Sequence, residues 1–192
     1  WSSSNTSVAT VSNGVVKAVA FGTATITAKS NNGKTASCSV TVNPIQPTGI
    51  KATPETSTLY GLNGTVKLSA NVMPSNATNK TVTWSSNNTS VATVSSDGTV
   101  KAVGYGTTVI TAKTVNGLTS NCTVTVNPIA VTGVSLNKTS LSFTGTGSSQ
   151  TLTATVSPSN ATNQTLTWSS SNTSVATVSN GVVKAVAFGT AT

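Results

Sequence analysis

Few side chains in this sequence can take part in catalysis or bind a metal. The 192 residues include no histidine, two acidic residues (Glu55 and Asp97) and two cysteines (Cys38 and Cys122). Without histidine, the commonest general base and the imidazole ligands of transition metals are missing. A glycosidase needs two carboxylates flanking one bond, and a calcium site needs several carboxylate oxygens. The sequence therefore predicts no catalytic residue, no metal site and no cofactor.

The two cysteines stand at matching places in a repeated phrase, ASCSVTVNPI and SNCTVTVNPI. One cysteine per repeat excludes a disulfide within a repeat, and a bridge between repeats would need Cα atoms within about 7 Å. Each cysteine alternates with two valines, as in a strand with one buried face. We predict that Cys38 and Cys122 are small buried core residues, with a cross-link between chains as the alternative.

A long repeat is the strongest signal in the sequence. Trp1, Trp84 and Trp168 each open the same phrase of about 25 residues, and residues 1–25 are identical to residues 168–192. The tryptophan spacing defines a unit of about 84 residues. The predicted divisions are a partial C-terminal repeat, a complete repeat and a repeat lacking its last strands, at residues 1–46, 47–130 and 131–192. Near-identical copies are expected to continue in both directions.

The composition and the local patterns favour short strands. Charged residues make up 6% of the chain and aromatic residues 4%, so the core must come from aliphatic side chains. Residues 67–72 and 122–126 alternate between polar and apolar, Thr108, Ile110 and Ala112 share one face of a further strand, and no helical periodicity is present. Asn-Gly and Asp-Gly pairs predict type I′ hairpin turns between strands. Seven or eight such strands in about 84 residues predict an all-β, immunoglobulin-like β-sandwich for each repeat.

The aromatic residues recur with the repeat. Trp84 is in phase with Val82 in its strand, and the tryptophan recurs in every unit, so we predict that Trp1, Trp84 and Trp168 anchor the core; a sugar-binding platform is the alternative. A second set lies on glycine-flanked bends just before a strand, at Phe21, Tyr105 and Phe188. These three residues are candidates for capping the core, for a contact with a neighbouring domain or chain, or for ligand binding.

The motifs together resemble a known family. The pattern comprises VTGVSL (131–136), SPSNATN (157–163), SNTSVATV (171–178) and GTTVITA (106–112), with counterparts in the other repeats. It is similar to the bacterial Ig-like, group 2 family. The resemblance implies repeated domains of extracellular proteins on the bacterial cell surface, including adhesins, and spacers beside enzymatic modules. The family has no catalytic residues to carry over, and its binding surfaces differ between members.

The distribution of charge indicates which kinds of partner the chain could bind. The formal net charge is +8, and all ten cations are scattered lysines. Nucleic-acid binders cluster Arg and Lys and add stacking aromatics, so no nucleic-acid partner is expected. No apolar run approaches the ~20 residues of a membrane span. Spaced lysines keep a strand-rich surface soluble, and a weak attraction to cell-wall polymers is the alternative.

Three functions remain open on the sequence. The first is a structural stalk or fibre, in which the partners are neighbouring repeats and identical chains in a filament. The second is an adhesin module that binds a host receptor, a glycan or a cell-wall polymer, where repeated weak sites give avidity. The third is a spacer attached to an enzyme. The near-identity of the copies favours the stalk or fibre, because selection for a binding site would make one copy differ in sequence from the others.

Overall fold

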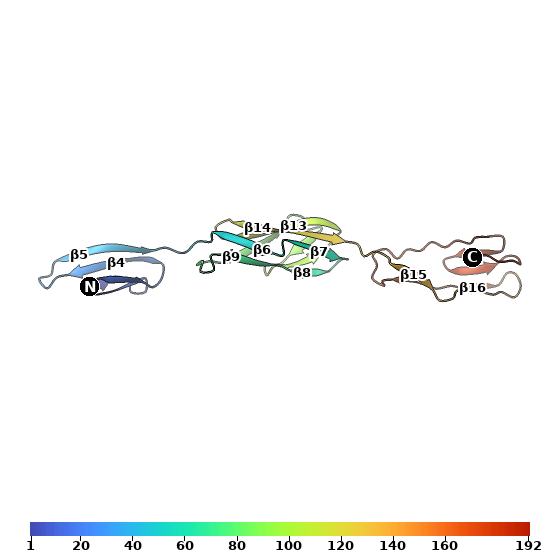
Figure 1. The fold of residues 1–192 in the computed structure, drawn as a ribbon, viewed down its shortest axis with the longest axis horizontal. Helices are drawn as coiled ribbons and strands as arrows, with labels where there is room; N and C mark the ends of the chain where they lie inside the picture. The colour runs from blue at the N-terminus through green and yellow to red at the C-terminus, as the bar shows by residue number, and fades with distance from the viewer. The chain divides into compact units, whose positions relative to one another are not determined.

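The computed structural model describes residues 1–192, and every regular element in it is a β-strand (Figure 1). The all-β prediction is therefore confirmed, and no helix long and apolar enough to cross a membrane occurs. Residues 1–46 form β1 (Ser2–Ser3), β2 (Ala9–Ser12), β3 (Val15–Ala18), β4 (Gly22–Lys29) and β5 (Thr35–Val42). Residues 47–130 form β6 (Gly49–Thr53), β7 (Thr56–Tyr60), β8 (Thr65–Lys67), β9 (Ser69–Met73), β10 (Val82–Ser86), β11 (Ala92–Val94), β12 (Thr99–Ala102), β13 (Gly106–Thr114) and β14 (Thr119–Asn127). Residues 131–192 form β15 (Gly133–Leu136), β16 (Ser149–Thr151), β17 (Ala154–Ser157), β18 (Ala176–Ser179) and β19 (Val182–Ala185).

The strands of residues 47–130 form three sheets. One sheet has the order β10-β13-β14-β7, the second has the order β11-β12-β8, and the third pairs β6 with β9. β14 runs parallel to β7, whereas β12 pairs antiparallel with β8 and β6 pairs antiparallel with β9. A parallel pair joins strands that are distant in sequence, so β7 depends on β14 for its only strand neighbour in the sheet.

The flanking repeats form only part of this set. Residues 1–46 form the sheet β1-β4-β5 and the hairpin β2-β3. Residues 131–192 form the sheet β16-β19-β18 and the pair β15-β17. By sequence position, β4 and β5 are the counterparts of β13 and β14, and β16 and β19 are those of β8 and β12.

The core is concentrated in residues 47–130. The largest side chains that are fully buried all lie there, in Leu68, Val100, Ile110, Cys122, Val124 and Val126. Alternation along β14 turns every second side chain inward, as the sequence predicted for Cys122, Val124 and Val126. A smaller cluster in residues 1–46 joins Val8, Ala9 and Ala24.

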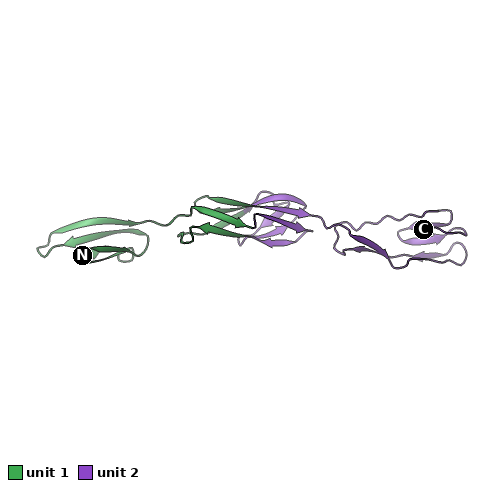
Figure 2. Cartoon of the chain, viewed as in Figure 1, with its two compact units in different colours: residues 1–53, 69–84, 111–121 green, residues 54–68, 85–110, 122–192 purple.

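The compact units of the structure do not coincide with the predicted repeats. Figure 2 shows one unit of residues 1–53, 69–84 and 111–121, and a second of residues 54–68, 85–110 and 122–192. Strands β10, β13 and β14 each run from one unit into the other. The repeat boundaries of the sequence therefore stay a prediction.

The turn prediction needs a correction. Asn13 and Gly14 both have positive φ, and so do Asn180 and Gly181, as a type I′ turn requires. At Asn32-Gly33 and Asn116-Gly117 only the glycine has positive φ, and the same holds at Asp97-Gly98, where the glycine has a φ of 84°. The reason is one additional residue in this hairpin, which lengthens the turn so that Gly98 N–H donates to the carbonyl of Ser95.

Candidate functional site

The carboxylate of Asp97 is committed to the turn that contains it. It accepts hydrogen bonds from the backbone N–H and the hydroxyl of Thr99, each at 3.0 Å, and from the hydroxyl of Ser95. Lys67 Nζ lies 2.6 Å from Oδ2 in an exposed ion pair. These contacts, led by Lys67, hold the pKa of Asp97 well below its usual range. Such a carboxylate stays ionised and positions a turn; it is a poor proton donor or acceptor near neutral pH.

The other residues of catalytic type do not join Asp97. The backbone carbonyl of Glu55 accepts from Thr123 N–H at 2.9 Å, which ties this residue to the start of the β7–β14 pairing. No group of three His, Cys, Asp or Glu side chains gathers where it could hold a metal ion. The structure brings together no set of side chains with the geometry of a catalytic centre.

The two equivalent cysteines lie in different surroundings. Cys122 is fully buried, and this burial raises the pKa of its thiol. Cys38 is exposed, although it occupies the matching place in β5. The structural core role of Cys38 and Cys122 in a complete repeat stays a prediction.

The three equivalent tryptophans also differ in burial. Trp84 and Trp168 are half-buried, whereas Trp1 is 66% exposed. The rings of Trp1 and Trp168 lie over the turn glycines Gly14 and Gly181, where an added Cβ would meet a ring carbon at 3.4 and 3.3 Å. The role of Trp1, Trp84 and Trp168 as core anchors of a complete repeat stays a prediction.

The three bend aromatics differ in their contacts. Tyr105 Oη lies 3.2 Å from Thr162 Oγ1, a hydrogen bond that joins residues 47–130 to residues 131–192. Phe21 and Phe188 have no hydroxyl and are 58% and 88% exposed. Tyr105 is also exposed, at 43%.

A second contact near Thr162 was not predicted from the sequence. Ile129 N–H donates to Thr162 Oγ1 at 2.8 Å, and Thr162 N–H donates to the Ile129 carbonyl at 2.8 Å. The same two bonds join Ile45 to Thr78, at 2.9 and 2.8 Å. Each pair fastens the connecting segment NPI to the SNATN loop of the repeat that follows. The available signal was the recurrence of this loop at a fixed distance after each connector.

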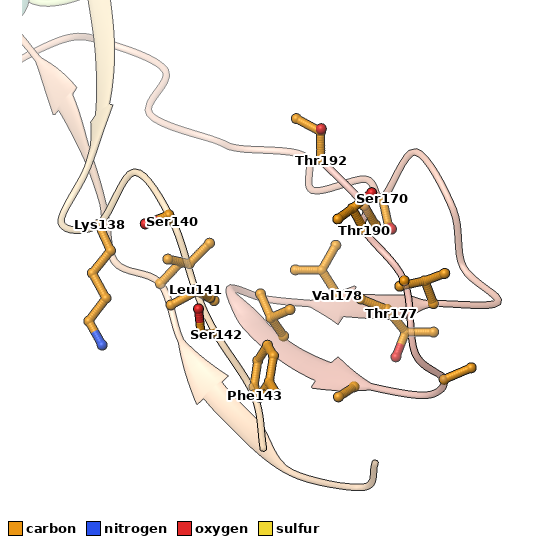
Figure 3. A pocket seen from close by; sticks show the side chains of 18 of the residues that line it. Lys138, Ser140, Leu141, Ser142, Phe143, Ser170, Thr177, Val178, Thr190 and Thr192 are labelled. Atoms are coloured by element: carbon orange, nitrogen blue, oxygen red, sulfur yellow. The ribbon is translucent and has the colours of Figure 1, made fainter. Parts of the chain in front are cut away.

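A hollow within residues 131–192 measures about 660 Å³. Figure 3 shows residues 138–143 on one side of it and Ser170, Thr190 and Thr192 on another. Its apolar lining includes Leu141, Phe143 and Trp168. These side chains are aliphatic or aromatic, and no acid lines the hollow, so it offers no carboxylate for acid–base chemistry or for a metal.

The geometry agrees with a comparison to known protein families. The family model for the bacterial Ig-like domain (group 2) matches residues 1–40, 47–126 and 130–192. The chain therefore belongs to this family, as the resemblance in the sequence implied. Its fold class is the tandem immunoglobulin-like β-sandwich.

Curated relatives come from different kinds of protein. An uncharacterized protein of Clostridium acetobutylicum is 40% identical over 68% of this chain and 14% of that protein. An Ig-like virion protein of Serratia phage KSP90 is 35% identical over 77% of this chain and 58% of that protein. An alpha-L-arabinofuranosidase of Bifidobacterium longum is 50% identical over 33% of this chain and 6% of the enzyme. The chain thus spans less than two thirds of each of these relatives.

Proposed function

We propose that this chain is a non-catalytic structural array of Ig-like repeats, serving as a stalk or fibre component of an extracellular protein on the bacterial cell surface. The observation that carries the proposal is the repeated fastening at the connectors. Ile45 with Thr78 and Ile129 with Thr162 make the same two hydrogen bonds. A stalk needs such a joint at every repeat, whereas a binding module needs a distinctive surface on at least one repeat.

The chemistry of the side chains supports this function. The interior of residues 47–130 is aliphatic, and the buried polar residues Thr108 and Thr114 serve the fold. Thr108 Oγ1 accepts from Asn88 N–H at 3.0 Å, and Thr114 Oγ1 accepts from Leu118 N–H at 3.0 Å. Polar groups thus satisfy the backbone at strand ends and turns. The role is a structural one in the surface or virion setting of related Ig-like domains, and it is compatible with a spacer position beside an enzyme.

Electron microscopy and light scattering of the protein test the proposal, together with a binding screen. We expect filaments with a spacing of one or two repeats, or rods of defined mass that bind nothing. Saturable binding to a host glycan, a receptor or a purified cell-wall polymer would overturn the stalk role and support the adhesin alternative. The control is a chain with a scrambled surface charge, Lys51→Glu and Lys101→Glu, which separates specific binding from attraction of a +8 protein to polyanions.

A further inference from the structure

An asparagine followed by glycine readily loses ammonia from its side chain, because glycine has no Cβ to shield the backbone nitrogen that attacks the side-chain amide. The chain has five such pairs, at Asn13-Gly14, Asn32-Gly33, Asn63-Gly64, Asn116-Gly117 and Asn180-Gly181. All of these asparagines are exposed, so water reaches each of them. The pairs differ in the hydrogen bonds that hold the asparagine side chain and the glycine N–H.

In residues 47–130, protein groups hold the pair Asn116-Gly117 at both reacting atoms. Asn116 Oδ1 accepts from the hydroxyl of Thr114 at 2.7 Å, and Asn116 Nδ2 donates to the carbonyl of Pro47 at 2.8 Å. Gly117 N–H donates to the Thr114 carbonyl at 3.0 Å. The side-chain amide and the backbone nitrogen of this pair are therefore both fixed in the turn between β13 and β14.

The corresponding atoms of Asn63-Gly64, in the same repeat, have no protein partner. Neither the side chain of Asn63 nor the N–H of Gly64 makes a hydrogen bond within the protein. This pair is anchored only through its outer backbone groups. Asn63 N–H donates to the Ala102 carbonyl at 3.0 Å, and Ala102 N–H donates to the Gly64 carbonyl at 2.9 Å. The peptide bond between Asn63 and Gly64 lies between these two anchors, and no hydrogen bond to the protein restrains the groups that would react.

We propose that Asn63 is a site of spontaneous deamidation in the folded protein and that the hydrogen bonds of Asn116 protect it from the same reaction. The Gly64 nitrogen, after giving its proton to hydroxide or water, attacks Cγ of Asn63. A carbon–nitrogen bond forms, and the side-chain nitrogen takes up a proton and leaves as ammonia. Water then opens the cyclic imide at either carbonyl, which gives aspartate or isoaspartate. The net reaction consumes water and releases ammonia, and it needs no oxidant.

The hydrogen bonds decide the rates because the ring closes only from a particular alignment of Cγ with the glycine nitrogen. Each turn must open locally to reach this alignment. Opening at Asn116 breaks the bonds to Thr114 and Pro47 and frees Gly117 N–H from its acceptor. Opening at Asn63 breaks no side-chain bond. Since each bond stabilises the closed turn, the reaction at Asn116 should be at least about tenfold slower.

The pair Asn180-Gly181 belongs with the unprotected group. It forms a two-residue turn, and neither the side chain of Asn180 nor Gly181 N–H bonds to a protein group. Its surroundings match those of the complete repeat: Leu152 N–H donates to the Gly181 carbonyl at 2.8 Å, as Leu68 N–H donates to the Gly98 carbonyl at 2.9 Å. Deamidation at this turn is therefore expected as well.

The modification changes both the charge and the backbone of the exposed turn. Each event replaces a neutral amide with a carboxylate and lowers the formal net charge of +8 by one. Isoaspartate also adds a methylene to the main chain between the two bonds to Ala102, so the turn before β8 should loosen. The surface of the protein thus changes with age, and this inference goes beyond the stalk role and does not depend on it.

The test follows each asparagine in the 192-residue chain by peptide mapping and mass spectrometry in mildly alkaline, isotopically labelled water. Label entering the new carboxyl group reports opening of the imide. We expect Asn63, Asn180 and Asn13 to react first, and Asn116 at least about tenfold more slowly. Asn32 should also react slowly, because Gly33 N–H donates to the Ser30 carbonyl at 3.0 Å. In urea that unfolds the chain, all of them should react at similar rates.

Two variants change one pair at a time, and Asn180 in the same molecule serves as the internal reference. Gly64→Ala adds a Cβ that meets no atom closer than 3.8 Å, at a position without positive φ, so the fold should be kept while the reaction at Asn63 slows severalfold. Thr114→Val removes the hydroxyl that holds Asn116 Oδ1 and should accelerate deamidation there. Thr114→Ser retains the hydroxyl and is the matched control.

Equal rates at Asn63 and Asn116 in the folded chain would overturn the inference. An order of reaction that persists in urea would do the same, because the hydrogen bonds of the fold would then not decide which side chain reacts. An unchanged rate at Asn63 in Gly64→Ala would contradict attack by the Gly64 nitrogen. None of these results bears on the stalk role, which microscopy and the binding screen test separately.

Discussion

Residues 1–25 and 168–192 have the same sequence but different surroundings, and the comparison separates local from long-range effects. Both segments form the same hairpin with the same register: Ala9 pairs with Ala18, and Ala176 with Ala185. Their burial differs. Ala9 is buried and Ala18 exposed in the first segment, whereas Ala185 is buried and Ala176 half-buried in the third repeat.

The difference comes from the strands that each segment meets. Residues 1–25 lead into β5, whose Val40 and Val42 pack near Val8, Ala9 and Ala24. Residues 168–192 meet β16, which pairs with β19 from the opposite edge. Hairpin formation is thus a local property of the sequence, whereas the burial of its residues depends on the strands that pack against it.

The largest effect on stability is expected at Leu68, compared with its counterpart Leu152. Leu68 is 1% exposed in the complete repeat, and its counterpart Leu152 is half-buried. Leu68→Ala should destabilise its repeat by about 3 kcal/mol or more through lost burial and a residual cavity. Leu152→Ala should cost less than half as much. Urea unfolding monitored by NMR signals from each repeat measures both, and equal costs would refute the comparison.

The tryptophans provide a second matched pair. Trp84→Ala should cost about 3 kcal/mol, the lower end of the range for a buried tryptophan, because Trp84 is half-buried. Trp1→Ala should change stability by no more than about 0.5 kcal/mol, since Trp1 is 66% exposed. Thermal unfolding followed by circular dichroism gives both values. An unchanged melting temperature for Trp84→Ala would rule out its role as a core anchor.

A smaller, pH-dependent effect is expected at the turn of Asp97. Its pKa is lower in the folded than in the unfolded chain, so the carboxylate contributes stability at neutral pH and loses it as the pH falls below about 4. Asp97→Asn copies the residue of the other two repeats, at Asn13 and Asn180. The variant should melt lower than the parent at pH 7, and the difference should shrink toward about pH 2 and in high salt. A difference that grows with acid would contradict this assignment.

The smallest effect is expected at Gly104, where the other repeats have Ala20 and Ala187. An added Cβ would lie 2.5 Å from the carbonyl oxygen of Ser90, which suggests a clash. The other repeats show how the backbone adjusts. The hydrogen bond from residue 104 to the Val91 carbonyl is 3.1 Å with glycine, and the equivalent bonds of Ala20 and Ala187 are 3.3 Å. Gly104→Ala should therefore change stability by at most about 0.5 kcal/mol, and a loss above about 1.5 kcal/mol in calorimetry would show that this adjustment is not available.

Strands and turns were predictable because they depend on neighbours in sequence. The strand expected at residues 57–60 is β7, and the one at residues 48–52 is β6. The parallel pairing of β7 with β14 was not predictable, since it depends on contacts distant in sequence. For the same reason the exposure of Cys38 could not be inferred from its similarity to Cys122.

The functional surfaces were only partly accessible to sequence reasoning. The bend aromatics stood out by their glycine neighbours, but the hydrogen bond of Tyr105 with Thr162 depends on a hydroxyl that Phe21 and Phe188 lack. The role of Thr78 and Thr162 lies in a loop without any residue of catalytic type. A repeated motif in such a loop indicates a structural contact as readily as a binding site.

The most direct test of the central comparison is hydrogen exchange of the two hairpins at a concentration where the protein is a single chain. The amides of β13 and β14 should exchange only through unfolding of residues 47–130. The amides of β5 that point away from β4 should exchange at least about 100-fold faster, because no strand of residues 1–46 pairs with that edge. Equal protection of β5 and β14 in the single chain would contradict the account, since it would show that residues 1–46 complete their sheet without the other half of a sandwich.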